Sequence, residues 1–186
     1  HARHKLNDAW STILMAHGNY MEGNQDRQDD GFLDIPHARQ LNIYNRWQYN
    51  SGKRLESQIG WRLIHDERQG GQFSKDGHSH NELYTTDVIN RRGELFGKLG
   101  IVYPENPDKS IGNIAQFTVH QLDSRFGKID YDASQRTLFL QSIYQNSFYS
   151  CSHKYKIGLN YRYDRWVETI DSLDRITLES VPGVFV

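Results

Sequence analysis

Oxygen-bearing side chains recur at alternate positions in one acidic stretch of the chain, as they do in calcium-binding loops. The residues on the first, third, fifth and ninth positions of such a loop are Asp26, Gln28, Asp30 and Asp34. Gly31 stands at the sixth position, where the loop must bend sharply, and His37 stands where a bidentate Glu would complete the set. The spacing predicts a calcium ion as a cofactor that stiffens this loop. The alternative is a solvated acidic loop with Gly31 as its turn.

Other residue types that could do chemistry are sparse. His78 and His80 lie two apart in a stretch rich in Gly and Ser, but no third metal ligand is near in sequence, which favours a solvated loop. The single cysteine, Cys151, excludes an internal disulfide. The chain has no Gly-x-Ser-x-Gly motif, no phosphate-binding glycine loop and no paired-cysteine motif. The sequence therefore predicts no enzymatic activity.

The clearest structural signal is the alternation between His153 and Asp164. One side of this segment carries Tyr155, Ile157, Leu159, Tyr161 and Tyr163, and the other side carries Lys156, Gly158, Asn160, Arg162 and Asp164. Successive side chains of a strand point to opposite faces, so this is a ribbon with one apolar face and one polar face. Its length of about ten residues is what a tilted strand needs to cross a bilayer.

The same alternation recurs along the chain, and we expect eight or nine antiparallel strands. The expected strands are 10–20, 40–49, 54–67, 83–103 (with a bulge or break at Arg91–Gly93), 110–122, 135–145, 153–164 and a further strand after 178. The hydrophobic fraction of 37% lies below the roughly 45–50% of globular chains, whereas aromatic residues reach 12%. No run approaches the roughly 18 apolar residues of a membrane helix. A net charge of −1 offers no basic field for nucleic acid.

Short and long connections alternate in this series. The short links are Asn7–Asp8, 50–53, 104–109 and 146–152, and the long links are 21–39, 68–82, 123–134 and 166–178. Outer-membrane barrels have short turns on one side and long loops on the other. The pattern predicts an all-β fold: an antiparallel up-and-down transmembrane β-barrel segment whose polar faces line a lumen.

Several motifs resemble the barrel of TonB-dependent outer-membrane receptors, over nearly the whole chain. The similar stretches are Lys5-Leu6-Asn7-Asp8, Trp10-Ser11-Thr12, Asp29-Asp30-Gly31-Phe32-Leu33-Asp34-Ile35-Pro36, Leu41-Asn42-Ile43-Tyr44-Asn45-Arg46-Trp47, Asp66-Glu67-Arg68-Gln69-Gly70-Gly71-Gln72, Ser110-Ile111-Gly112, His153-Lys154-Tyr155-Lys156 and Glu179-Ser180-Val181-Pro182-Gly183-Val184-Phe185. Among these receptors the chain is most similar to the cobalamin branch.

The resemblance implies an outer-membrane location and active import of a scarce ligand, cobalamin or a related metal chelate. Residues 1–186 would be part of the barrel domain, without the N-terminal plug through which such receptors contact the TonB complex. His1 and the stretch Ser180–Val186 read as the ends of an internal segment. The implied partners are the TonB complex, outer-membrane lipid, the small-molecule ligand and a surface lipoprotein.

Two other interpretations stay open from the sequence. The first is a complete small outer-membrane barrel with a structural role, which would insert into lipid alone. The second is a soluble β-sandwich or lipocalin-like ligand binder, which would be monomeric without detergent. Coordinates with helices, or with Tyr155, Leu159 and Tyr161 between stacked layers, would exclude the importer.

Overall fold

A computed structural model of the chain describes residues 2–73, 83–148 and 153–186, and these form a single sheet of nine strands. The expected His78 and His80 pair and Cys151 lie outside the described residues. The strands are β1 (Ala2–Lys5), β2 (Trp10–Met21), β3 (His37–Asn50), β4 (Leu55–Gly71), β5 (Thr85–Tyr103), β6 (Asn106–Phe126), β7 (Ile129–Ser147), β8 (Lys154–Ile170) and β9 (Leu173–Phe185).

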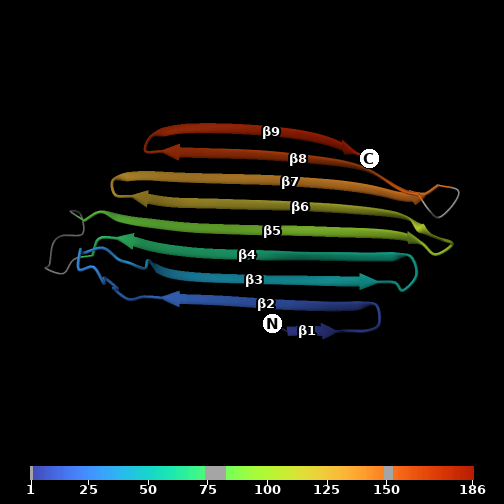
Figure 1. The fold of residues 1–186 in the computed structure, drawn as a ribbon, viewed down its shortest axis with the longest axis horizontal. Helices are drawn as coiled ribbons and strands as arrows, with labels where there is room; N and C mark the ends of the chain where they lie inside the picture. Colours follow the sequence, from blue (N-terminus) through green and yellow to red (C-terminus); the bar gives the residue numbers. More distant parts are fainter. Residues whose placement is uncertain (1, 74–82, 149–152) are drawn as a thin grey trace.

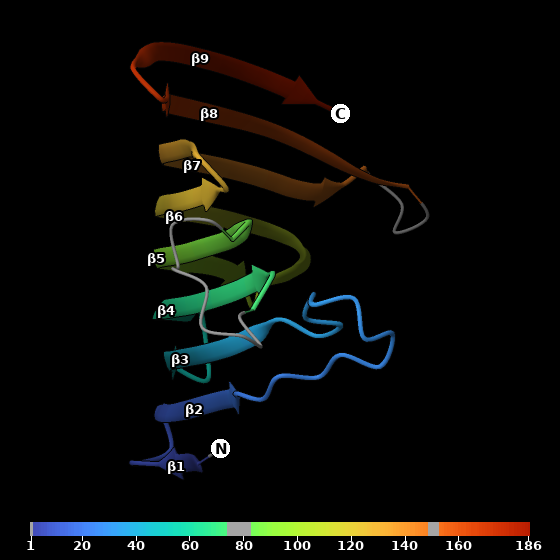
Figure 2. The ribbon, with the colours of Figure 1, turned by 90° about the vertical axis from the view of Figure 1, so that its left-hand side faces the viewer.

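Each strand pairs antiparallel with the next one in the chain, in the order β1 to β9 (Figure 1). The prediction of an all-β, antiparallel, up-and-down fold is therefore confirmed. The sheet is twisted and curved but not closed, because β1 and β9 lie at opposite edges (Figure 2). No helix among the described residues is long and apolar enough to span a membrane.

The pairing register assigns every strand residue to one of two faces, because directly opposed residues point to the same side. We call the side that carries Leu63, Gly93, Val119 and their neighbours the apolar face. The polar face is the other side, where Arg62, Glu94 and Thr118 lie opposite one another. This division holds through all the long strands, so the two-residue alternation of the sequence describes the sheet correctly.

Two of the four expected long loops are wrong. The stretches 123–134 and 166–178 continue as strands and close in tight turns at Gly127 and Asp171, whose φ angles are 62° and 53°. Positive φ angles of this kind suit two-residue hairpins, whose twist matches that of the strands. The expected bulge or break at Arg91–Gly93 is also wrong, since β5 pairs with β4 and β6 in unbroken register there.

The sheet is a single layer, so the described residues contain no core between stacked layers. Leu159, at the centre of the ribbon that the sequence singled out, is 58% exposed, and Leu63 is 53% exposed. The described residues that are buried all lie on the polar face: they are Ala38, Gly60, Thr118, Ser124, Ala133, Gly158 and Asp164. A soluble β-sandwich would bury the apolar face instead, and this arrangement does not.

A glycine on the polar face allows a close approach of neighbouring groups. A Cβ added to Gly60 would lie 2.6 Å from Cζ of Phe96 and 2.7 Å from the backbone oxygen of Asn45. We expect Gly60→Ala to lower the free energy of unfolding by about 1–3 kcal/mol, because the ring and the backbone must both shift. The matched control is Gly97→Ala, where the nearest atom is 3.9 Å away. Urea unfolding of both variants in micelles checks this, and equal losses would contradict it.

Candidate functional site

The apolar face carries a continuous band that crosses the sheet. We define a row as the side chains that lie directly opposite one another on neighbouring strands. The row at one edge of the band contains Leu55, Ile101, Ile111, Tyr144 and Ile157. The row at the other edge contains Ala16, Ile43, Leu63, Gly93, Val119, Arg136, Arg165 and Leu178. On β4 the band extends from Leu55 to Leu63, nine residues, which matches the roughly 9–11 residues of a membrane-crossing strand.

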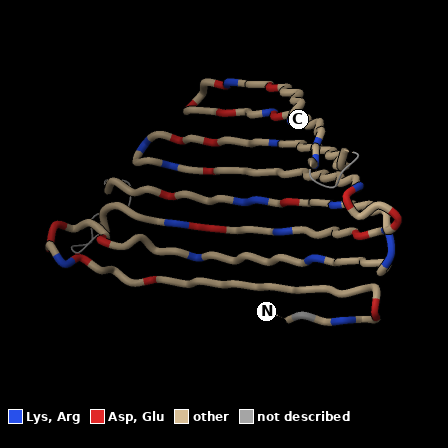
Figure 3. Tube along the Cα trace, turned by 45° about the vertical axis from the view of Figure 1, so that its right-hand side comes forward, with Lys and Arg blue, Asp and Glu red and all other residues tan. Residues whose placement is uncertain are grey.

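Charged residues are excluded from most of this band. In its first four rows, from the Leu55 row to the Trp61 row, the described apolar face has no Asp, Glu, Lys or Arg. Towards the loop between β2 and β3, the first charged residues of this face are Arg136 and Arg165 in the fifth row. Charged residues are frequent in the rows that follow. Over both faces of the described residues, both signs of charge are spread along the strands and the turns (Figure 3). The charge-free rows are therefore a property of one face at one height of the sheet.

Aromatic rings gather at the short-turn end of the band. The rings of Trp10 and Tyr49 have centroids 4.9 Å apart, and those of Tyr144 and Tyr155 are 6.2 Å apart. Nζ of Lys109 lies 4.4 Å from the centre of the Tyr103 ring at the same end. Amphipathic rings at the rim of an apolar band are typical of membrane–water interfaces.

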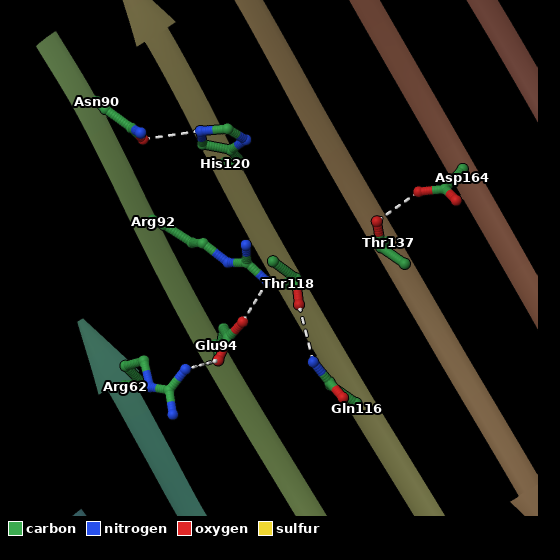
Figure 4. Close-up of polar contacts among 9 residues, drawn as sticks. All are labelled: Arg62, Asn90, Arg92, Glu94, Gln116, Thr118, His120, Thr137 and Asp164. Atoms are coloured by element: carbon green, nitrogen blue, oxygen red, sulfur yellow. Dashed lines mark hydrogen bonds and ion pairs between the residues drawn. The ribbon is translucent and has the colours of Figure 1, made fainter. Parts of the chain in front are cut away.

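The polar face behind the band carries charged groups in contact with one another (Figure 4). The side chain of Glu94 on β5 is only 9% exposed and lies between two arginines. Arg62 approaches it from β4 at 3.6 Å, and Arg92 forms a second ion pair along β5. A carboxylate taken from water needs such partners to remain charged. The row that holds Glu94 lies behind the apolar band, between its fourth and fifth rows.

A second carboxylate in the same row is held by three donors. Asp164 on β8 is 7% exposed and accepts hydrogen bonds from Thr137 Oγ1, from Gln135 Nε2 at 2.9 Å and from Arg162 Nε. On β6, His120 Nε2 lies 2.7 Å from the side-chain oxygen of Asn90. The polar face therefore carries several separate groups of ion-paired or hydrogen-bonded side chains, distributed from β4 to β8 (Figure 4).

Each face is hollowed in places. A polar hollow of about 290 Å³ lies beside Asp164 and is lined by Arg162, Trp166, Glu168, Arg175 and Glu179 among others. The indole N–H of Trp166 is buried and has no hydrogen-bond partner among the described residues. An apolar hollow of about 600 Å³ lies on the band, over Trp47, Ile59, Leu99, Leu140 and Leu159. The two hollows suit different contents, polar solutes for the first and hydrocarbon for the second.

The short turns are tied to one another outside the band. Arg54, in the turn between β3 and β4, donates to Glu105, in the turn between β5 and β6, at 2.9 Å. A backbone hydrogen bond lowers the pKa of the Glu105 carboxyl, and the Arg54 guanidinium lowers this pKa further. The backbone N–H of Val102 also donates to the Arg54 oxygen, at 2.9 Å. These contacts fix the two turns side by side.

The candidate calcium residues lie in the loop between β2 and β3. Asp26 accepts hydrogen bonds from the backbone N–H groups of Asp30 and Gly31, and Asp34 accepts one from Arg27 at 2.8 Å. Gln28 takes part in none of these hydrogen bonds. Among the residues that the structure describes, no group of three or more His, Cys, Asp or Glu side chains is arranged to hold a metal ion. The carboxylates here cap backbone N–H groups, and the calcium site stays a prediction from spacing.

The same loop is anchored to the sheet. The backbone N–H of Leu33 donates to the Gly71 oxygen at 2.9 Å, and that of Phe73 donates to the Gly31 oxygen at 3.0 Å. Phe32 and Gln72 form an isolated β-bridge. The positive φ of 80° at Gly31 lets the chain turn towards the end of β4, so the turn expected at this residue is present.

Sequence reasoning did not identify these polar groups as a site. It assigned Arg162 and Asp164 to a polar face without predicting their partners, because partners on other strands depend on register. The alternation of carboxylates and arginines within a strand, as in Arg92–Glu94 and Arg162–Asp164, is the one signal that the sequence contains.

Comparisons with known proteins add no relative: no protein-family model, no curated protein and no solved structure matches this chain. Its function is therefore inferred from its own residues and from the resemblance described above.

Proposed function

We propose that this chain is part of the transmembrane barrel of an outer-membrane receptor, with its apolar face towards lipid and its polar face towards the lumen. The observation that carries the proposal is the apolar band, which is nine residues high on β4, a height that fits a membrane-crossing strand. Its first four rows hold no charged residue among those that the structure describes. A single-layer sheet with such a face in water would expose a continuous apolar surface far larger than soluble monomers show. Contact with lipid removes the unfavourable free energy of exposing this surface to water.

The open edges support closure by further strands. In hydrocarbon, unpaired backbone groups cost several kcal/mol each, so a membrane sheet must close. The outer side of β9 has no partner strand among the described residues, over its 13 residues. We propose that β1 and β9 pair with further strands to complete a barrel larger than nine strands.

The polar face supports a role in transport. Its charged groups and its hollow of about 290 Å³ would face a water-filled or plugged lumen, where polar solutes pass. Following the resemblance stated above, we propose that the cargo is cobalamin or a related metal chelate and that the TonB complex supplies the energy through a plug domain. The loops at the ends of β2 and β4 would then contact the cargo at the outer surface.

Depth-dependent fluorescence quenching tests the orientation of the sheet. Trp61 lies on the apolar face within the band, whereas Trp166 lies on the polar face. Two variants, each with a single tryptophan at one of these positions and Phe at the others, would be placed in vesicles whose acyl chains carry bromine. We expect strong quenching of Trp61 and little quenching of Trp166. Equal quenching, or none in either variant, would exclude a lipid-facing apolar surface.

A further inference from the structure

Two arginines oppose each other at the edge of the apolar band. Arg136 on β7 and Arg165 on β8 are direct cross-strand partners on the apolar face, and both are exposed. Directly opposed residues in such a pair have Cβ atoms about 4.5–5.5 Å apart, and like charges at this distance destabilise a sheet. Neither guanidinium has a hydrogen bond or an ion pair with another described residue.

The surroundings of this pair are apolar. In its own row the neighbours are Val119 on β6 and Leu178 on β9. The next row towards the centre of the band places Leu138 opposite Tyr163. No carboxylate lies in either of these two rows on the described apolar face, so the described residues supply no counter-ion to the two charges.

Other arginines on the same face are paired. Arg91 on β5 forms an ion pair with Asp123, and Arg125 on β6 forms one with Asp130. Both of these pairs lie further from the band, in the rows nearer the loop between β2 and β3. The absence of a partner at Arg136 and Arg165 is therefore specific to the boundary between the band and the charged rows.

We propose that Arg136 and Arg165 together bind the phosphate of a membrane lipid head group. The inference rests on the proposed orientation of the apolar face towards lipid, which places the boundary of the band at head-group level. A guanidinium presents N–H donors in a planar fork that fits phosphate oxygens, and an anion shared by two forks removes their mutual repulsion. The apolar stems of the side chains lie along the hydrocarbon while the charged ends reach the head groups.

The long-loop side of the band identifies the lipid class. The pair lies at the edge from which the strands continue towards the loop between β2 and β3, although β7 and β8 themselves end there in the tight turns at Gly127 and Asp171. We take this side as the outer one because of the loop between β2 and β3, since long loops of outer-membrane barrels face outwards. The probe is lipid A, a lipid that carries phosphate on a sugar head group. We take the bound group to be the phosphate of a lipid, and competition by free inorganic phosphate tests this choice.

The test compares the chain in phosphatidylcholine nanodiscs with and without lipid A, by native mass spectrometry of retained lipid. We expect the double variant Arg136→Gln/Arg165→Gln to weaken lipid A retention about thirtyfold, since the two arginines near an anionic surface together contribute on the order of 2 kcal/mol. The matched control, Arg91→Gln/Arg125→Gln, removes two paired arginines from the same face and should retain lipid A as the unaltered chain does.

Three outcomes would overturn the inference. Equal retention by the double variant and the unaltered chain would show that the pair does not bind the lipid. Competition by inorganic phosphate at millimolar concentration would show a general anion site. Equal loss in the control variant would show a diffuse charge effect. A second variant, Arg136→Lys/Arg165→Lys, keeps the charge and should bind with intermediate strength, which guards against a folding defect. Failure of the chain to enter nanodiscs would instead reject the proposed function.

Discussion

Leu140→Arg is expected to destabilise the sheet in a bilayer by about 2–4 kcal/mol, the cost of an arginine on the lipid face of a barrel near the membrane midplane. Leu140 lies in the third of the five rows of the band, between Ala115 on β6 and Tyr161 on β8. It is 41% exposed, so the larger side chain meets no steric obstacle. The expected loss therefore comes from taking a guanidinium into hydrocarbon.

The matched control uses the next residue. Gln141 points to the polar face, opposite Ile114 and Asn160, so Gln141→Arg places the same charge on the proposed lumen side. Its expected effect is within about 0.5 kcal/mol, because Gln141 is half-buried on the polar face and no hydrogen bond or ion pair joins its side chain to another described residue. The free energy of unfolding in urea, measured for both variants in vesicles, gives the comparison. A soluble protein would give the opposite ranking or none, because an arginine at exposed Leu140 would then face water.

Asp164→Ala is expected to lower the free energy of unfolding by about 2–3 kcal/mol, because it leaves partly buried donors without an acceptor. Its carboxylate accepts hydrogen bonds from Thr137, Gln135 and Arg162. Arg162 is more than half exposed, and water will replace part of its lost ion pair, which keeps the expected value below that of a fully buried pair.

The neighbouring strand supplies the control for this variant too. Glu179 on β9 lies directly opposite Asp164 but is exposed, and no hydrogen bond or ion pair joins it to another described residue. Glu179→Ala should change the free energy of unfolding by less than about 0.5 kcal/mol. Asp164→Asn keeps one acceptor and should lie between the two. If both alanine variants lose the same stability, the hydrogen bonds of Asp164 contribute nothing and this group of side chains is incidental.

The sequence alone predicted the elements whose signal is local. Side-chain alternation has a period of two wherever a strand separates two environments, and so the segment around Leu159 and Tyr161 identified both the strand and its faces. The sequence also predicted the turn at Asn50–Gly52, because glycine favours turns. The structure gives Gly52 a positive φ of 74°. These properties depend on neighbours within a few residues.

Local composition could not predict the structure of a stretch whose composition suits both a loop and a strand. The stretch 123–134 is polar whether it forms a loop or a ribbon, and only the pairing of Arg125 with Asp130 across a two-residue turn distinguishes them. The calcium pattern met the same difficulty, since carboxylates spaced for a cation also cap backbone N–H groups, as Asp26 does.

The sequence by itself determined the all-β class, the two faces of each strand and the absence of recognisable catalytic motifs. Only the tertiary structure decided the register. With the register it decided the height of the apolar band, the partners of Glu94 and Asp164, and the pairing of Arg136 with Arg165. The physical reason is that register depends on the hydrogen bonds between two neighbouring strands and on the length of the turn that joins them, and the pattern within one strand does not fix either. A shift by one residue would send every side chain to the other face.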